Sequence, residues 1–135
     1  MGRMVRRIGR GSATQRIELG GTTGIAQSGS NANGRYIKYA DGTMICTKTV
    51  THTGAILTAW GNLYESSPVN LGSFAQEFAE IPNISVTSQN GDGAWLEGVR
   101  QVTTTSAGIT NFLRPNSDTD SKTRNVSVIA VGRWQ

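Results

Sequence analysis

Alternation of apolar and polar residues predicts antiparallel β structure along most of this chain. The segment "RYIKYADGTMICTKTV", residues 35 to 50, contains two runs rich in aromatic and β-branched residues, joined across Asp41-Gly42. An Asp-Gly pair between two such runs is a strong signal for a tight hairpin turn. A further alternating run, "NISVTSQ" at 83 to 89, predicts another strand.

The segments between these strands carry weaker patterns. Residues 52 to 72 have no clean period, so we expect a long connection with at most one short strand. Phe74 and Phe78 have helical spacing, but Pro82 follows closely and favours a short turn or an extended segment. After the turn-forming "NGDG" at 90 to 93, the runs "AWLEGVRQVTTT" and "ITNFLRP" predict a second antiparallel pair.

The terminal segment "RNVSVIAVGRWQ" is apolar on both faces of a predicted strand. Ile129 and Val131 lie on one face, and the other face carries Val126, Val128, Ala130, Gly132 and Trp134. In a single sandwich one of these faces would contact water, whereas in an oligomer a neighbouring subunit can cover it. We therefore predict that Ile129 and Val131 lie in a subunit interface.

Together these elements predict an all-β fold, a small antiparallel β-sandwich. Roughly five to seven strands joined by turns, without a convincing long helix, are typical of that architecture. A length of 135 residues favours one domain. No apolar run approaches the roughly 20 residues of a membrane span, and "MGRMVRRIGRGS" lacks the apolar core of a signal peptide, so we expect neither membrane insertion nor a cleaved signal.

Basic charge is concentrated at the beginning of the chain. Five of the 13 basic residues precede the first acidic residue, Glu18; they are Arg3, Arg6, Arg7, Arg10 and Arg16. The remaining eight basic and nine acidic residues give the rest of the chain a net charge of −1. Residues 1 to 34 also hold eight of the 17 glycines, which predicts a flexible arm with "QRIEL" at 15 to 19 as its one candidate strand. The arm arginines could bind the phosphates of a nucleic acid or an acidic protein surface equally well. The rest of the chain is nearly neutral, which argues against recognition of nucleic acid by the folded body.

Catalytic and metal chemistry has little support in the residue content. Cys46 is the only cysteine and His52 the only histidine, which excludes an internal disulfide and a multi-residue cysteine or histidine metal cage. Glu77, Glu80 and Glu97 are interpreted as surface charges, because spacing alone does not make a pair of catalytic carboxylates. We expect no catalytic residues, no metal and no cofactor.

A partial calcium-loop pattern lies before the terminal strand. Asn116, Asp118 and Asp120 alternate as the first ligands of an EF-hand loop do, but Ser121 and Ser127 replace the required Gly and Glu. We interpret this segment as a solvated hairpin loop.

Aromatic residues in or beside loops are the candidate ligand-binding residues. Trp60, Tyr64 and Trp95 have this placement, and aromatic faces there commonly contact sugar rings or protein partners. Capping of the core or filling of a subunit interface is the alternative role for each of them. Arg100 is a further candidate ligand-binding residue, because a planar guanidinium suits carboxylates and acidic sugars. Arg114 has the same chemistry, although cross-strand ion pairs would explain the presence of both arginines.

Two stretches resemble known families of virion and lectin proteins. "SGSNANGRYIKYADGTMICTKTV" resembles a segment of bacteriophage tail-fibre proteins, in which an Asn-rich stretch precedes a Tyr-x-Lys-aromatic strand and a D-G-T turn. Phe74-x3-Phe78-x3-Pro82, then "VRQVTTTSAGITNF" and "VSVIAVGRW", are similar to the H-type lectin pattern. The resemblance covers about residues 28 to 135. It implies a homotrimeric β-sandwich on the exterior of a phage particle that contacts host glycans, without catalysis; no sugar-contacting residue of H-type lectins has a matching position here.

The leading hypothesis is therefore a phage fibre or spike knob. Residues 1–30 would be an attachment arm that binds capsid or tail proteins through its arginines, and residues 31–135 the knob that adheres to a host-surface glycan or receptor. In the trimer, Ile129 and Val131 would be interface residues. The alternative is a capsid decoration protein that stabilises the particle without binding a receptor, and a small polysaccharide-degrading enzyme is a third, less supported possibility.

Overall fold

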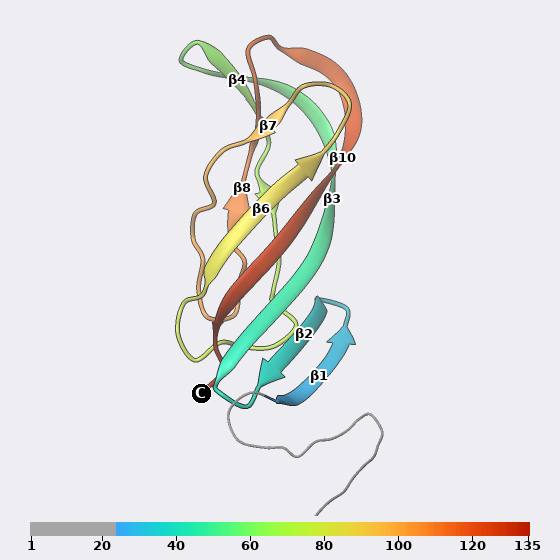
Figure 1. Ribbon diagram of the computed structural model, residues 1–135. Helices are drawn as coiled ribbons and strands as arrows, with labels where there is room; N and C mark the ends of the chain where they lie inside the picture. The colour runs from blue at the N-terminus through green and yellow to red at the C-terminus, as the bar shows by residue number, and fades with distance from the viewer. Residues whose placement is uncertain (1–23) are drawn as a thin grey trace, which may run out of the picture.

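The computed structural model describes residues 24–135, which form ten strands and no helix (Figure 1). The strands are all antiparallel to their partners, so the predicted all-β antiparallel fold is confirmed. Their bounds are β1 Ile25–Asn31, β2 Gly34–Tyr39, β3 Thr43–Trp60, β4 Leu63–Ser66, β5 Val69–Asn70, β6 Asn83–Gln89, β7 Trp95–Leu96, β8 Ile109–Thr110, β9 Phe112–Arg114 and β10 Asp118–Arg133. The arm arginines Arg3, Arg6, Arg7, Arg10 and Arg16 and the candidate strand 15–19 lie outside the described residues.

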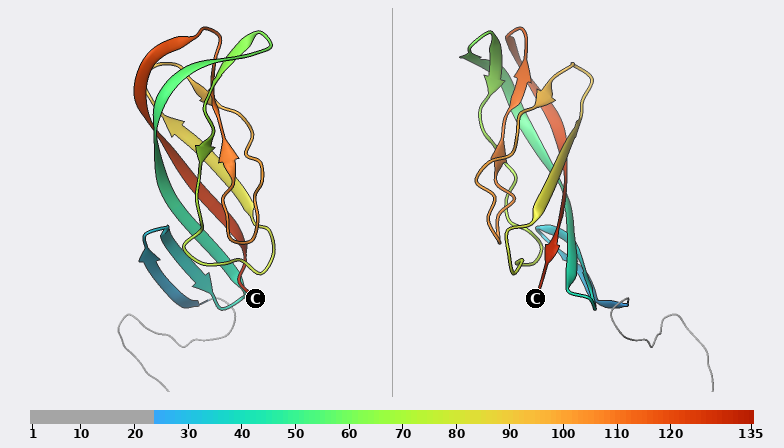
Figure 2. Two further views of the ribbon diagram at one scale, coloured as in Figure 1. Left: turned by 180° about the vertical axis from the view of Figure 1, so that it is seen from behind. Right: turned by 60° about the vertical axis from the view of Figure 1, so that its left-hand side comes forward.

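Two long strands organise the fold. β3 and β10 pair antiparallel from Thr43↔Arg133 to Ile56↔Asp118, and β6 continues the sheet beyond β10. Because β10 occupies one edge of β3, the other edge is shared by β2 along its first half and β4 along its end. The end of β3 bends, and β4, β9 and β7 fold back over the sheet as a second layer with the small β5–β8 pair (Figure 2). The result is a curled antiparallel sheet that covers itself.

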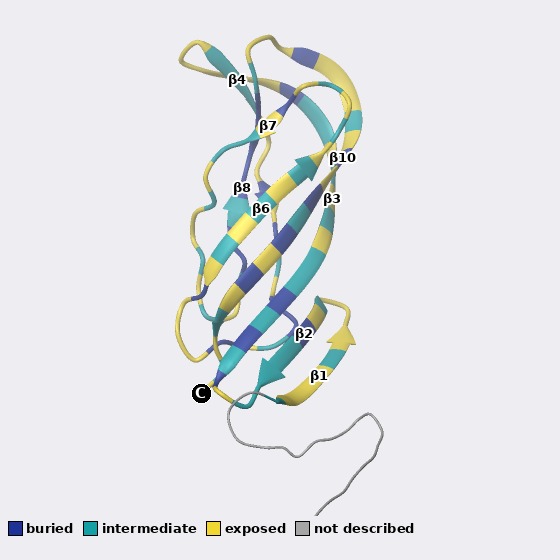
Figure 3. Cartoon of the chain, viewed as in Figure 1, coloured by how far each residue is buried: buried dark blue, intermediate teal, exposed yellow. Residues whose placement is uncertain are grey.

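The core lies between these two layers. Inward-facing residues alternate along β3 and β10, visible as the regularly spaced buried positions in Figure 3. The opposing layer contributes Phe112 and the pair Phe74 and Phe78, whose rings meet edge to face with centroids 5.0 Å apart. Each fully buried side chain of this size stabilises the fold by roughly 1.5–3 kcal/mol through removal of apolar surface from water. The Phe pair lies in an irregular segment, as Pro82 predicted.

The terminal strand buries one face only. Val126, Val128 and Ala130 are buried, while Ile129 is 50% and Val131 41% exposed. Val131 lies opposite Ile45 of β3, so the exposed residues form an apolar patch on the outer face of the sheet. The predicted division of this strand into two apolar faces is confirmed; the assignment of Ile129 and Val131 to a trimer interface stays a prediction.

The tight hairpin across Asp41-Gly42 is confirmed. Gly42 has φ +95°, a conformation that favours glycine, and the Thr43 backbone N–H donates to the Asp41 carboxylate at 2.9 Å. The residue that follows the terminal strand also contacts this turn, since the Trp134 indole N–H donates to the Tyr39 carbonyl at 2.9 Å.

Three predictions of local structure need correction or adjustment. The long connection expected over residues 52 to 72 is wrong, because β3 continues to Trp60 with β10 and then β4 as pairing partners. The second hairpin is present only as β7 paired with β9, and as a bridge from Arg100 to Ile109. Residues 25 to 30, which the sequence assigned to the arm, lie in β1 and pair with β2.

No helix in the described part of the chain is long and apolar enough to cross a membrane.

Candidate functional site

The outer face of the β4–β9–β7 layer presents aromatic and acidic side chains. Glu65 of β4, Leu113 of β9 and Trp95 of β7 are direct cross-strand neighbours, and Trp60 lies opposite Leu63 beside them. Facing residues of paired strands share a face; on this face Trp60 and Trp95 are exposed, whereas Leu113 is buried. The intervening residues Ser66 and Phe112 are buried on the opposite face.

A pocket of about 310 Å³ lies on this face. It is lined by Trp60, Glu65, Glu97, Gly98 and Arg100, and the Trp60 side chain is 51% exposed. The structure thus brings together two of the predicted ligand-binding residues, Trp60 and Arg100. This open pocket therefore combines an exposed indole, a guanidinium and two carboxylates.

The other two predicted ligand-binding residues have different positions. Trp95 is 41% exposed and lies in the same cross-strand row as Glu65, on the same face as the pocket. Tyr64 is partly buried and packs against the hydrophobic core, since it alternates with Glu65 along β4. Tyr64 therefore lies on the inner side of the layer and supports it.

The guanidinium of Arg100 is held in place by two partners. It is ion-paired with Glu97, and its Nη2 donates to the Asn111 side-chain oxygen at 2.7 Å. Asn111 is buried, and its own amide donates to the Ser66 carbonyl at 2.7 Å. Since these contacts use two of the five N–H donors of an arginine and the side chain is 44% exposed, further donors can reach a ligand without reorganisation.

The backbone around Arg100 is strained. Gln101 has φ +61°, an uncommon conformation for a residue with a side chain, and costs on the order of 1 kcal/mol. Arg100 and Ile109 exchange two backbone hydrogen bonds of 3.0 Å. This close pairing requires Gly108, because a Cβ there would lie 2.3 Å from the Arg100 carbonyl oxygen. Such strain is often concentrated where a binding residue must be oriented.

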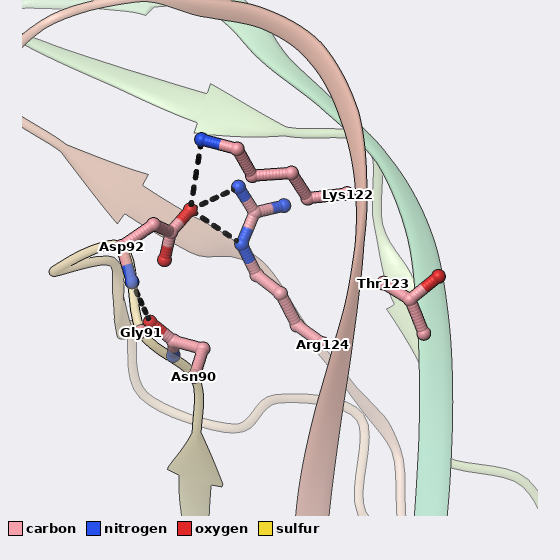
Figure 4. Close-up of a pocket in the computed structure, with 6 residues that line it drawn as sticks. All are labelled: Asn90, Gly91, Asp92, Lys122, Thr123 and Arg124. Carbon is pink, nitrogen blue, oxygen red and sulfur yellow. Dashed lines mark hydrogen bonds and ion pairs between the residues drawn. The ribbon is translucent and has the colours of Figure 1, made fainter.

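A second cluster of charges holds the turn that leads into β7. Arg124 is 1% exposed, and its Nε donates to Asp92 at 3.0 Å (Figure 4). Its Nη1 donates to the Gly54 carbonyl at 3.1 Å. Its Nη2 also contacts Asp118 at 3.4 Å, and the guanidinium lies over the Phe112 ring. Because these contacts use nearly all of its donors, Arg124 fixes the 90–93 turn, and with it the position of Trp95.

The carboxylates of this cluster are charged over a wide pH range. The hydrogen bond from Arg124 is the main cause that lowers the pKa of Asp92, and the hydrogen bond from Lys122 is the main cause for Asp118. Lys122 lies 2.7 Å from Asp118 and 4.0 Å from Asp92, and Arg114 lies 2.9 Å from Asp118. The interpretation of residues 116 to 123 as a solvated loop is wrong at Asp118, which is buried among cations at the start of β10. Among residues 24–135, no three His, Cys, Asp or Glu side chains gather as metal ligands do.

None of the remaining candidate chemical groups lines this pocket. Burial raises the pKa of the Cys46 thiol, and burial together with the nearby Arg124 charge lowers the pKa of His52. The His52 Nε2 lies 3.3 Å from the Ser67 hydroxyl. Glu77 accepts a hydrogen bond from Thr104 at 3.3 Å, and Glu80 is exposed.

The comparisons with known proteins give one structural match. No family model and no curated protein sequence matches the chain. The fold is similar to part of the tailspike gp61 of Pseudomonas phage phi297, with a TM-score of 0.44 and 12% sequence identity. The match covers 67% of this chain and 16% of the tailspike, so this chain corresponds in length to a small part of that protein.

Proposed function

We propose that this protein binds a glycan of a host-cell surface through the pocket of Trp60 and Arg100, as the adhesion domain of a phage particle. The observation that carries the proposal is the exposed Trp60 indole beside an arginine whose orientation is fixed by Glu97 and by the buried Asn111. We expect binding without hydrolysis, because Glu97 is engaged by Arg100, whereas a general acid needs a carboxyl in apolar surroundings.

The pocket chemistry matches the surface of a sugar ring. A pyranose has an apolar C–H face that packs against an indole, and hydroxyl groups at its edge that both donate and accept hydrogen bonds. In this pocket Trp60 offers the flat apolar surface, Arg100 offers donors, and Glu65 and Glu97 offer acceptors. Because Arg100 is already ordered, ligand binding does not have to immobilise it.

The placement on a particle is supported by the sequence. Residues 28 to 135 resemble tail-fibre and H-type lectin segments, and the arginines of the first 16 residues are separated in sequence from the nearly neutral body. We propose that the arginine-rich segment that precedes β1, with Arg3, Arg6, Arg7, Arg10 and Arg16, attaches three copies to other virion proteins. The outer sheet face would then be the trimer contact, since Ile129 and Val131 are exposed there next to a groove lined by Arg35, Thr47 and Ser127.

The test is retention of the full-length protein on an array of bacterial surface glycans. Replacement of Trp60 by Ala is expected to weaken binding about tenfold, which corresponds to about 1.4 kcal/mol of lost stacking and burial. Ile81→Ala is the matched control, because Ile81 is 65% exposed and lies before β6, outside the pocket lining. Retention of no glycan, or equal binding by the Trp60 variant, would contradict the proposal.

The exposed apolar face favours one second candidate, a capsid decoration protein. Ile129 and Val131 would in that case contact neighbouring capsid subunits instead of sister chains. Particles that lack the protein would then be less resistant to heat, and the isolated protein would be monomeric and retain no glycan.

A further inference from the structure

We propose that the Trp60–Arg100 pocket discriminates against sugars that carry a carboxylate. The inference deepens the proposed function and rests on it, because it concerns the ligand of the same pocket. It differs from the sequence-based expectation, in which Arg100 would bind an acidic sugar.

The charge balance of the pocket carries this inference. Two carboxylates, Glu65 and Glu97, and one guanidinium, Arg100, line it, so its formal net charge is −1. Arg100 is ion-paired with Glu97, and within residues 24–135 no ion pair links Glu65 to a cation. A ligand carboxylate would therefore approach Glu65 and an arginine whose charge is largely balanced by Glu97. Like charges brought together at this open surface site oppose binding, most strongly at low salt.

The Glu97 carboxylate already occupies part of the Arg100 guanidinium. Nη1 is engaged by Glu97 and Nη2 by Asn111, which leaves one N–H on each Nη and the Nε N–H free within the described part of the chain. A ligand carboxylate that used these donors would share the guanidinium with Glu97 and lie close to its carboxylate, whereas a hydroxyl would not meet this repulsion.

A sugar without a carboxylate avoids this repulsion. An uncharged hydroxyl accepts from Arg100 and donates to Glu65 or Glu97. Vicinal hydroxyls on a ring stacked against Trp60 therefore fit the pocket, and its net negative charge would not oppose an ammonium group.

The experiment uses pairs of immobilised sugars that differ at one substituent, which is a neutral hydroxymethyl group in one member and a carboxylate in the other. The pairs are galactose with galacturonate and glucose with glucuronate, presented to the full-length protein at neutral pH and low salt. We expect a neutral member to bind about tenfold or more tightly than its acidic counterpart, and this difference to shrink as salt screens the charges. Glu65→Gln should reduce the difference to about threefold or less, because it removes the unpaired charge. Glu80→Gln, at an exposed position outside the pocket lining, should leave it unchanged.

The outcomes separate this inference from the proposed function. If a sugar binds in a manner that depends on Trp60, but the acidic member binds as tightly as the neutral one, the inference is wrong and the proposed function stands. If no member of any pair is retained, or if Trp60→Ala changes nothing, the proposed function fails and the inference fails with it.

Discussion

Replacement of Arg124 by Met should destabilise the whole fold. Arg124 is almost completely buried and joins three parts of the chain: the turn at Asp92, the Gly54 carbonyl of β3, and Asp118 at the start of β10. Met fills a similar volume but donates no hydrogen bond. The substitution leaves the carboxylate of Asp92 with Lys122 alone, at 4.0 Å, as its remaining cation.

The size of the effect follows from what each partner retains. Removal of one member of a buried ion pair costs roughly 3–5 kcal/mol when its partner is left uncompensated. Asp118 keeps Lys122 at 2.7 Å and Arg114 at 2.9 Å, so the loss falls mainly on Asp92 and on the Gly54 carbonyl. We therefore expect about 3 kcal/mol, at the low end of that range, out of a total of about 5–15 kcal/mol for a domain of this size.

Urea and thermal unfolding measure this loss. A loss of about 3 kcal/mol lowers the melting temperature by about 10–15 °C. Arg133→Met is the matched control, because Arg133 is exposed and donates only to backbone carbonyls, and it should change stability by less than about 0.5 kcal/mol. Unfolding of the Arg124 variant within about 1 kcal/mol of the parent would refute the view that this buried cluster holds the layers together.

Three further predictions concern the same fold. Hydrogen bonds and cations lower the folded-state pKa values of Asp92 and Asp118. The stabilisation by these carboxylates is therefore present above the unfolded pKa of about 3.9 and is lost as the pH falls through the folded pKa values. The urea midpoint of the parent protein should fall between pH 6 and pH 2, and a constant midpoint would contradict this. Gly108→Ala should cost about 1 kcal/mol or more and weaken glycan binding, because φ is +85° and the new Cβ would clash with the Arg100 carbonyl; unchanged melting and binding would show that this contact is unimportant. Ile129→Lys should convert a trimer to monomers in light scattering while the exposed-site control Leu57→Lys does not, and a persistent trimer would remove Ile129 from the interface.

Alternation along the strands was the most reliable sequence signal. It placed Val126, Val128 and Ala130 in the core and left Ile129 outside, because successive side chains of a strand point to opposite faces. The same rule extends to Arg124, which shares the buried face with Val126. A charged residue on that face was visible in the sequence, and it indicated a buried ion pair that we did not predict.

Elements defined by distant partners were not predictable from local pattern. The middle of β3, from Thr51 to Gly54, carries mostly polar residues and glycine, and it is a strand because β10, some 70 residues away, supplies its hydrogen bonds. The pairing of Asp92 with Arg124 likewise joins residues 32 positions apart. No window of the sequence contains both partners, so composition and spacing could not reveal the cluster.

The candidate site was partly visible in the sequence. Trp60 and Arg100 were singled out because aromatic and guanidinium groups are chemically suited to ligands, and the fold brings them to one pocket. The residues that orient Arg100 were missed. Asn111 was the available signal, since an amide inside the apolar run "ITNFLRP" must find hydrogen-bond partners when it is buried.

Mapping of a bound sugar by nuclear magnetic resonance tests the central claim most directly. The indole N–H signals of Trp60 and Trp134 serve as internal probes, because Trp60 lines the pocket while the Trp134 indole donates to the Tyr39 carbonyl near the hairpin turn. Titration of the full-length protein with a neutral glycan retained on the array should shift the signals of Trp60 and the Arg100 side chain and leave Trp134 unchanged. A saturable shift confined to other residues, with Trp60 and Arg100 unaffected, would contradict the assignment of this pocket as the glycan site.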